Sequence, residues 1–105
     1  MNDSQIEAAA TLLSVLGEPS RLRILRELWE GPRSVGEIVE HTGLKQSNVS
    51  RQLALLFEAG IVARDKQGTS RHYSIALPIV RDLCALVCEG AETAARRKAE
   101  ALRGA

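Results

Sequence analysis

The sequence predicts a mainly α-helical protein with one small β-hairpin. Apolar residues recur at helical spacing through most of residues 4–60, and again from residue 78 to about residue 102. Between these stretches the period changes, and residues 61–66 and 71–75 have the pattern of two strands joined by a glycine-containing turn. The 105 residues suit one compact domain that is small for burying its own core, so association with a second copy is expected.

Two helices with recognisable boundaries are expected first. Ser4 and Glu7 have the spacing of a capping box and open a first helix that ends at Gly17. Pro19 starts a second helix, which the Gly-Pro pair at residues 31–32 stops. The candidates for its core-facing side are Leu22, Leu25, Leu28 and Trp29, with core packing favoured over ligand stacking for the tryptophan.

The next two helices have the spacing of a helix-turn-helix. Ser34 and Glu37 repeat the capping-box spacing and open a short third helix that closes at Gly43. A fourth helix follows and ends at Gly60. A short helix, a turn beginning with glycine and a second helix form the helix-turn-helix arrangement. With the hairpin behind it, the predicted fold is a winged helix-turn-helix of four helices, two strands and a last helix.

The fourth helix has the composition of a DNA-reading helix. Val49, Leu53 and Leu56 form one apolar stripe, and no carboxylate precedes Glu58 near the far end. Short polar side chains let a helix lie deep in the major groove, and Gln and Arg can bond base edges bidentately. The predicted base-reading residues are Gln46, Ser47, Asn48, Ser50 and Arg51, with Gln52 on or beside the same face.

Basic residues are concentrated on this reading segment. The net charge of the whole chain is only +1, but residues 45–72 hold five basic and two acidic side chains. The expected partner is a double-stranded DNA operator, although a patch of this size is also common on solvated surfaces. The predicted contacts to the DNA backbone are Lys45, Arg64, Lys66, Gln67, Arg71 and His72. For His72, a solvent-exposed position on the strand without a DNA contact is an equal alternative.

These segments resemble the ArsR-type (arsenic-repressor-like) winged-helix transcriptional regulators of bacteria. The resemblance covers residues 16–77, through LGEPSRLRILRELWEG, SVGEIVEHTGLKQSNVSRQLALLFEAGIV and the wing GTSRHYSI. It implies a homodimer that represses an operon until an inducer loosens its grip on the operator. Residues 1–105 would then form a single winged-helix DNA-binding domain, with dimerisation helices at both ends. The apolar stripes expected to pair are Leu12, Leu13 and Leu16 with Ile79, Leu83 and Val87.

The known sensor spacings of that family are absent from this sequence. Metal-sensing members carry Cys-Val-Cys at positions that here are Ser34, Val35 and Gly36. Others place Asp and His ligands on the last helix, which here offers Asp82 and no histidine. A persulfide-sensing branch pairs a cysteine on the second helix with one on the last, but this second helix has none. Zinc, cadmium or arsenic sensing by those spacings is not expected.

A pair of cysteines, Cys84 and Cys88, remains on the last helix. At i and i+4 their Cβ atoms lie about 5–6 Å apart. The two thiols could hold a thiophilic metal or metalloid, or be joined by a disulfide or polysulfide bridge, and so respond to the inducer. The alternative is a stripe of small residues that packs against the partner subunit, because cysteine is a good buried hydrophobe. The sequence leaves both open.

Other function classes receive less support. An enzyme is not expected, because no catalytic constellation, Gly-x-Ser-x-Gly elbow or Gly-rich phosphate loop is present. No 18-residue apolar run and no signal peptide are found, so a cytoplasmic protein without a membrane partner is expected. The competing class is a protein-interaction module, since winged helices also dock proteins and a net charge of +1 would suit one.

Overall fold

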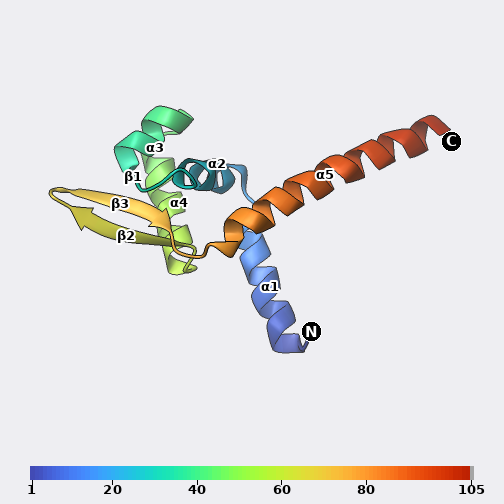
Figure 1. Cartoon of the computed structure of the whole chain (residues 1–105), viewed down its shortest axis with the longest axis horizontal. Coiled ribbons are helices and arrows are strands. Elements are labelled where there is room, and N and C mark those ends of the chain that lie inside the picture. Colours follow the sequence, from blue (N-terminus) through green and yellow to red (C-terminus); the bar gives the residue numbers. More distant parts are fainter. Residues whose placement is uncertain (105) are drawn as a thin grey trace.

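The computed structural model describes residues 1–104, except for the side chain of Gln67. It has the predicted order of helices and hairpin strands, with one further short strand (Figure 1). The elements are α1 (Asp3–Leu16), α2 (Pro19–Leu28), β1 (Arg33–Ser34), α3 (Val35–Thr42), α4 (Gln46–Glu58), β2 (Val62–Gln67), β3 (Ser70–Ile75) and α5 (Ile79–Gly104). The fold is a winged helix-turn-helix, as predicted.

Local hydrogen bonds explain where the first helix begins. Asn2, not Ser4, caps α1: its Oδ1 accepts from the Gln5 N–H at 2.8 Å, and Gln5 Oε1 accepts from the Asn2 N–H at 3.0 Å. The prediction of a Ser4–Glu7 cap was therefore wrong, because Asn2 and Gln5 offer the same spacing two residues earlier.

The cap predicted for the third helix is confirmed. The Glu37 N–H donates to the Ser34 hydroxyl at 3.2 Å, and the Ser34 N–H donates to Glu37 Oε1 at 3.0 Å. Two donors at the start of α3 are thereby satisfied within the chain.

The sheet has three antiparallel strands in the order β1-β3-β2. In the hairpin, Val62 lies opposite Ile75 and Gln67 opposite Ser70, so the turn is two residues rather than the four expected. Gly68 in that turn has a φ of 61°, which glycine adopts readily. The unpredicted strand β1 joins the other edge of β3, with Ser34 opposite His72. The wing is thus bound to the start of α3.

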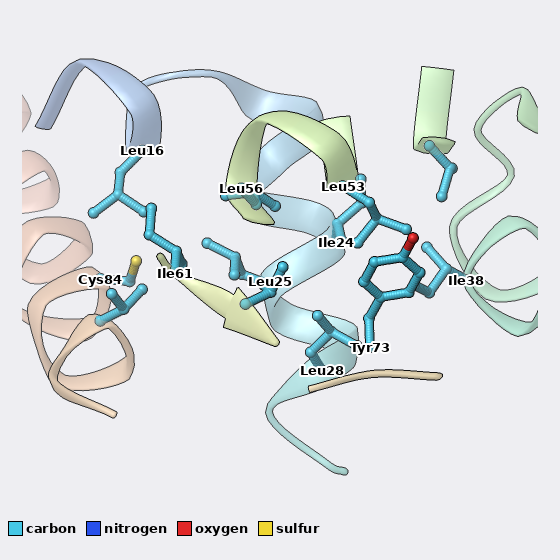
Figure 2. Close-up of a cluster of buried hydrophobic side chains, with 13 residues drawn as sticks. Leu16, Ile24, Leu25, Leu28, Ile38, Leu53, Leu56, Ile61, Tyr73 and Cys84 are labelled. Atoms are coloured by element: carbon cyan, nitrogen blue, oxygen red, sulfur yellow. The ribbon is translucent and has the colours of Figure 1, made fainter. Parts of the chain in front are cut away.

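One apolar core holds the helices and the wing together (Figure 2). The predicted α4 stripe is confirmed as buried, and Trp29 packs against the core as a half-buried side chain. In α2 the prediction for Leu22 was wrong, because Leu22 is exposed and Ile24 is buried instead. The buried apolar residues are Leu16, Ile24, Leu25, Leu28, Ile38, Val49, Leu53, Leu56, Ile61, Val62, Tyr73, Val80 and Cys84.

The first and last helices extend away from this core (Figure 1). Their apolar side chains are covered only where the helices join it, and Leu16, expected on an uncovered stripe, is buried there. Of the described helices, α5 included, none is long and apolar enough to cross a membrane. The large apolar side chains left exposed on α1 and α5 are Ile6, Leu13, Ile79, Leu86, Val87 and Leu102.

Candidate DNA interface

The turn between α3 and α4 is fixed by local hydrogen bonds. Gly43 is left-handed, with a φ of 74°, and its N–H donates to the Val39 carbonyl at 2.9 Å. The Thr42 hydroxyl donates to the Ile38 carbonyl at 2.6 Å and accepts from the Leu44 N–H at 3.2 Å. These bonds hold α4 at a set angle to α3, as a helix-turn-helix requires.

Helix α4 presents an exposed polar face on which no acidic side chain precedes Glu58, at the far end of the helix. Gln46, Ser47, Ser50 and Arg51 are all exposed, and no acid lies in the first turn. Lys45 precedes the helix, is exposed and makes no side-chain capping bond. This end of the helix carries the positive pole of the helix dipole, which favours nearby phosphate. The face combines groups that can bond base edges with groups that attract the DNA backbone.

Asn48 differs from the other four predicted base readers. It is half-buried, and its Nδ2 donates to the Ser20 hydroxyl at 3.3 Å. Its Oδ1 accepts from Gln52 Nε2 at 3.0 Å and from the Arg51 guanidinium at 3.2 Å. Gln52 in turn accepts through Oε1 from the Arg21 guanidinium at 2.9 Å. The amide of Asn48 is therefore engaged within the chain.

The expectation that Gln52 lies on or beside the outer face was wrong. Its side chain is only 6% exposed. Positions 49, 52, 53 and 56 complete the i, i+3, i+4, i+7 spacing of a buried stripe, so helical periodicity could have placed it correctly. Its partner Arg21 could not have been found in this way, because the two residues lie 31 positions apart in the chain.

The basic side chains of the wing lie at two distances from the hairpin turn. Lys66 lies opposite Arg71 next to the turn, and both side chains are exposed. Arg64 lies nearer the base, where its guanidinium carbon is 4.1 Å from the centroid of the Phe57 ring on α4. This cation–π contact ties the base of the wing to the end of the reading helix.

His72 is oriented towards α3. Its Nε2 lies 3.8 Å from a carboxylate oxygen of Glu37, and its buried Nδ1 has no hydrogen-bond partner among the described residues. The residue pairs with Ser34 of β1 and Asp65 of β2, in the middle of the sheet. Gln67, the remaining predicted wing contact, has a side chain outside the described part.

The exposed cations of this surface remain available for DNA. Within residues 1–104 as described, the ion pairs with carboxylates involve only histidines. Exposed cations without a carboxylate partner can exchange their counterions for phosphates. The cations concerned are Lys45, Arg51, Lys66 and Arg71.

The two cysteines line a small apolar pocket between α1 and α5. Cys84 is buried and Cys88 is exposed. Burial raises the pKa of the Cys84 thiol, and the neighbouring Cys88 raises it further. Over the described residues, no group of three or more His, Cys, Asp or Glu side chains could hold a metal ion. The pocket has a volume of about 130 Å³ and is lined by Leu13, Leu16, Gly17, Leu22, Leu83, Cys84, Val87 and Cys88.

A fixed helix-turn-helix, an acid-free reading face and a basic wing together define a DNA-binding winged helix-turn-helix protein. Residues 18–64 match the family described as bacterial regulatory protein, arsR family. The chain belongs to this family, because regulators that are 36% and 44% identical to it are also matched over more than two thirds of their length. It is therefore a transcriptional regulator and not an enzyme.

Three relatives illustrate the match. The HTH-type transcriptional regulator Rv0081 of Mycobacterium tuberculosis is 44% identical over 78 residues, which cover 73% of this chain and 68% of that protein. Its crystal structure superimposes with a TM-score of 0.78 and 37% identity, covering 91% of this chain and 98% of that one. A probable mercury resistance operon repressor of Streptomyces lividans is 36% identical over 90 residues, covering 85% and 72% of the two chains.

The third is a solution structure from Mycobacterium bovis, described as the homodimeric winged helix-turn-helix DNA-binding domain of Mb0332. It has a TM-score of 0.75 and 32% identity, and covers 88% of each chain.

Proposed function

We propose that the protein is a dimeric repressor that binds a two-fold symmetric operator and releases it when an inducer engages Cys84 and Cys88. The observation that carries the DNA-reading part is the exposed, acid-free face of α4. Side chains on this face contact base edges in the major groove and set the sequence preference. The base-reading residues in this proposal are Gln46, Ser47, Ser50 and Arg51.

The wing and the start of α4 supply contacts to phosphates. Lys66 and Arg71 are exposed beside the hairpin turn and reach the backbone next to the groove that α4 occupies. Lys45 does so at the positive end of α4. Arg64 contributes from the base of the wing, while His72 braces the wing against α3 through Glu37. These contacts fix position and add affinity for any sequence.

Dimerisation follows from the uncovered apolar side chains of α1 and α5. Leu13 is 51% exposed and Val87 is 53% exposed, although both line the same apolar pocket. A second copy that covers both helices removes this surface from water. The homodimeric Mb0332 domain supports the same assembly here. The two α4 helices then meet half-sites about 34–36 Å apart on one side of the duplex.

The geometry of the cysteine pair favours some inducers over others. Cβ atoms at i and i+4 of a helix lie about 5–6 Å apart. A disulfide needs about 3.5–4.5 Å, so forming one between Cys84 and Cys88 distorts α5. A thiophilic ion or a short sulfur chain spans the gap with less distortion. The likeness to a probable mercury resistance operon repressor makes mercuric ion the first candidate to test.

The difference in exposure between the two thiols supports a different part for each in this proposal. Cys88 is exposed and meets the inducer first, whereas Cys84 is buried and closes the bridge afterwards. The raised pKa of Cys84 fits this order, because a thiol must lose its proton before it can bind a soft ion. Closing the bridge pulls one turn of α5 tighter and tilts the helices that set the separation of the two reading helices. A third ligand, where the ion needs one, comes from the partner chain or from solvent.

A second reading of the cysteines rests on the burial of Cys84 in the core. Leu16, Ile61 and Cys84 lie together where α5 joins the core (Figure 2). Cys84 could serve there purely as a small apolar side chain. In that case the regulator has no thiol response and its signal enters elsewhere.

The deciding experiment measures DNA affinity in three chemical states side by side. Duplex DNA is first selected from a random pool with the reduced protein. The affinity for this DNA is then measured for reduced, oxidant-treated and mercuric-ion-treated protein. We expect treatment with mercuric ion to weaken binding about 10- to 100-fold, within the range of typical allosteric couplings. The double variant Cys84→Ser with Cys88→Ser is expected to bind equally well in all three states. If it loses DNA as the parent does, the cysteines only pack.

Salt dependence separates a DNA regulator from a protein-docking module. Affinity for the selected duplex should fall steeply as salt rises, because each phosphate contact releases counterions. A docking module would select no duplex from the pool.

A further inference from the structure

We infer that Arg21, Gln52 and Asn48 form a hydrogen-bonded relay that positions Arg51 for base reading and ties it to the end of α1. This inference rests on the proposed role of Arg51 as a base reader. The three relay residues are then positioning residues. They act on DNA recognition only through the Arg51 side chain.

The relay begins at the last turn of α1. The Arg21 Nε–H donates to the Val15 carbonyl, one of the last carbonyls of α1, which have no partner within the helix. The same guanidinium donates from NH1 to Gln52 Oε1 at 2.9 Å. Arg21 therefore joins α1 to α4 directly.

Its second half runs along α4. Gln52 Nε2 donates to Asn48 Oδ1 at 3.0 Å, and the Arg51 guanidinium donates to the same oxygen at 3.2 Å. The other end of the Asn48 amide donates to the Ser20 hydroxyl at 3.3 Å. Arg51 is exposed, yet its guanidinium is held on one side by a half-buried amide.

The residue types in the relay determine which group donates in each of its hydrogen bonds. Both ends are arginines, which donate and never accept. Arg21 therefore requires the oxygen of Gln52, which turns the NH₂ group of Gln52 towards Asn48. Arg51 requires the oxygen of Asn48, so that oxygen accepts from both neighbours. The amide at position 52 accepts from Arg21 and donates to Asn48 at once, which an apolar side chain cannot do.

Burial indicates that Gln52 is present for this contact and not for packing. Among the described residues, it is the single buried polar side chain, at 6% exposure, on the stripe that also carries Val49, Leu53 and Leu56. A buried amide is costly unless both of its ends are bonded. A leucine would complete the stripe at no such cost, yet a glutamine with both ends bonded is found.

The start of the relay lies beside the cysteine pocket. Val15 is followed by Leu16, which lines that pocket together with Cys84. Leu16 and Cys84 also share the apolar core (Figure 2). A shift of α1 against α5 moves the Val15 carbonyl and, through Arg21 and Gln52, the side chain of Arg51. The relay thus offers a path from the pocket to a base contact within one subunit.

The test compares Gln52→Leu with the parent protein. Leucine keeps the buried stripe apolar, so the variant is expected to unfold at a denaturant concentration equal to or above that of the parent. Discrimination at the base pair read by Arg51 should fall about 3- to 10-fold, the size of one hydrogen bond. Affinity for random DNA and its salt dependence should not change. The base pair is first identified from the specificity profile of Arg51→Ala.

A second pair of variants tests the α1 end of the relay. Arg21→Met should reproduce the loss seen in Gln52→Leu, and the double variant should lose no more than either single variant. Arg23→Met, on the exposed side of the same helix, is the matched control and should keep the parent profile. Additive losses in the double variant would overturn the relay.

A readout without DNA completes the test. In the parent, NMR relaxation of the Arg51 Nε–H group should show restricted motion, which Gln52→Leu should release. Unchanged motion together with an unchanged profile overturns the relay alone. If Arg51→Ala itself leaves the specificity profile intact, the base-reading role of Arg51 and the relay both fall.

Discussion

The reading head, residues 18–77, and the two terminal helices, α1 and α5, differ in how they bury their apolar side chains. The head surrounds a closed core in which residues such as Ile24 and Leu53 are fully buried. In α1 and α5 the buried residues are Leu16, Val80 and Cys84, all near the ends that join the head. The head therefore carries most of the core needed for its own fold, whereas the terminal helices present surface that a second chain can cover.

Because of this difference, the head supplies most of the folding stability and the terminal helices are the part suited to regulation. The proposed DNA contacts lie on the part that is packed by its own core, so the backbone of the reading head should keep its shape when the terminal helices move. The terminal helices depend on a neighbour for burial, so their arrangement can change at lower free-energy cost. A signal that acts on α1 and α5 can then move the heads without unfolding them.

The largest effect is expected from removing core volume in the head. Leu53→Ala should lower the free energy of unfolding by about 2–5 kcal/mol, because it leaves a cavity among fully buried side chains. Leu86→Ala on the exposed face of α5 should change it by less than about 0.5 kcal/mol in dilute protein. Urea unfolding of both variants at low concentration measures the contrast. Equal losses would remove the distinction between head and terminal helices.

A charge on the terminal helices should disrupt assembly instead. Val87→Glu is expected to weaken dimerisation by about 2 kcal/mol or more, the size of an interface hot spot, with little change in unfolding at low concentration. Ala54→Glu, at an exposed position of α4, makes a matched charge change in the head and should leave dimerisation intact. Sedimentation across micromolar concentrations reports both. A parent protein that stays monomeric while binding DNA would contradict the dimer.

Within the head, substitutions on the exposed face of α4 and on the wing should change DNA binding in different ways. Gln46→Ala should cost about 1–3 kcal/mol at one base pair and relax specificity there. Lys66→Ala should weaken binding to all sequences alike and reduce the salt slope by about 1. Binding measured on a library of single-base operator variants distinguishes the two. Identical profiles would disprove the assignment of α4 to bases and of the wing to phosphates.

The smallest effect concerns the cap that joins the wing to α3. The Ser34 N–H, and then the Ser34 hydroxyl, hold the pKa of Glu37 below its usual range. Stability from this group is present above the unfolded pKa of Glu37 and is lost as pH falls through the lower, folded value. Glu37→Gln keeps an acceptor for the cap but cannot titrate. Unfolding measured across that acidic window should show a steeper slope in the parent than in the variant, in which other carboxyls such as Glu18 still titrate.

Local signals predicted most of the fold. The α3 cap, the end of α3 at Gly43 and the apolar stripe of α4 each depend on residues within a few positions of one another, and each is confirmed. Capping fails as a predictor only where two signals overlap, as with Asn2 and Ser4, since both have the right partner three residues later.

Contacts between distant parts of the chain could not be predicted. Strand β1 has only two residues and exists because β3 offers it a free edge, which no pattern within residues 33–34 reveals. The Arg21–Gln52 bond likewise joins two helices across 31 residues. For the candidate site, exposure on α4 was predictable from helical spacing, but the engagement of the Asn48 amide depended on Ser20 from another helix.

Ser34 has a consequence for how this sequence can change over generations. It pairs with His72 in the sheet and also caps α3, so one residue belongs to two elements. An insertion or deletion within residues 33–37 breaks either the pairing or the cap. The preceding residues 30–32 and the hairpin turn at residues 68–69 carry neither constraint. Length variation among descendants of this sequence should therefore gather at those two places and spare the segment between Arg33 and Glu37.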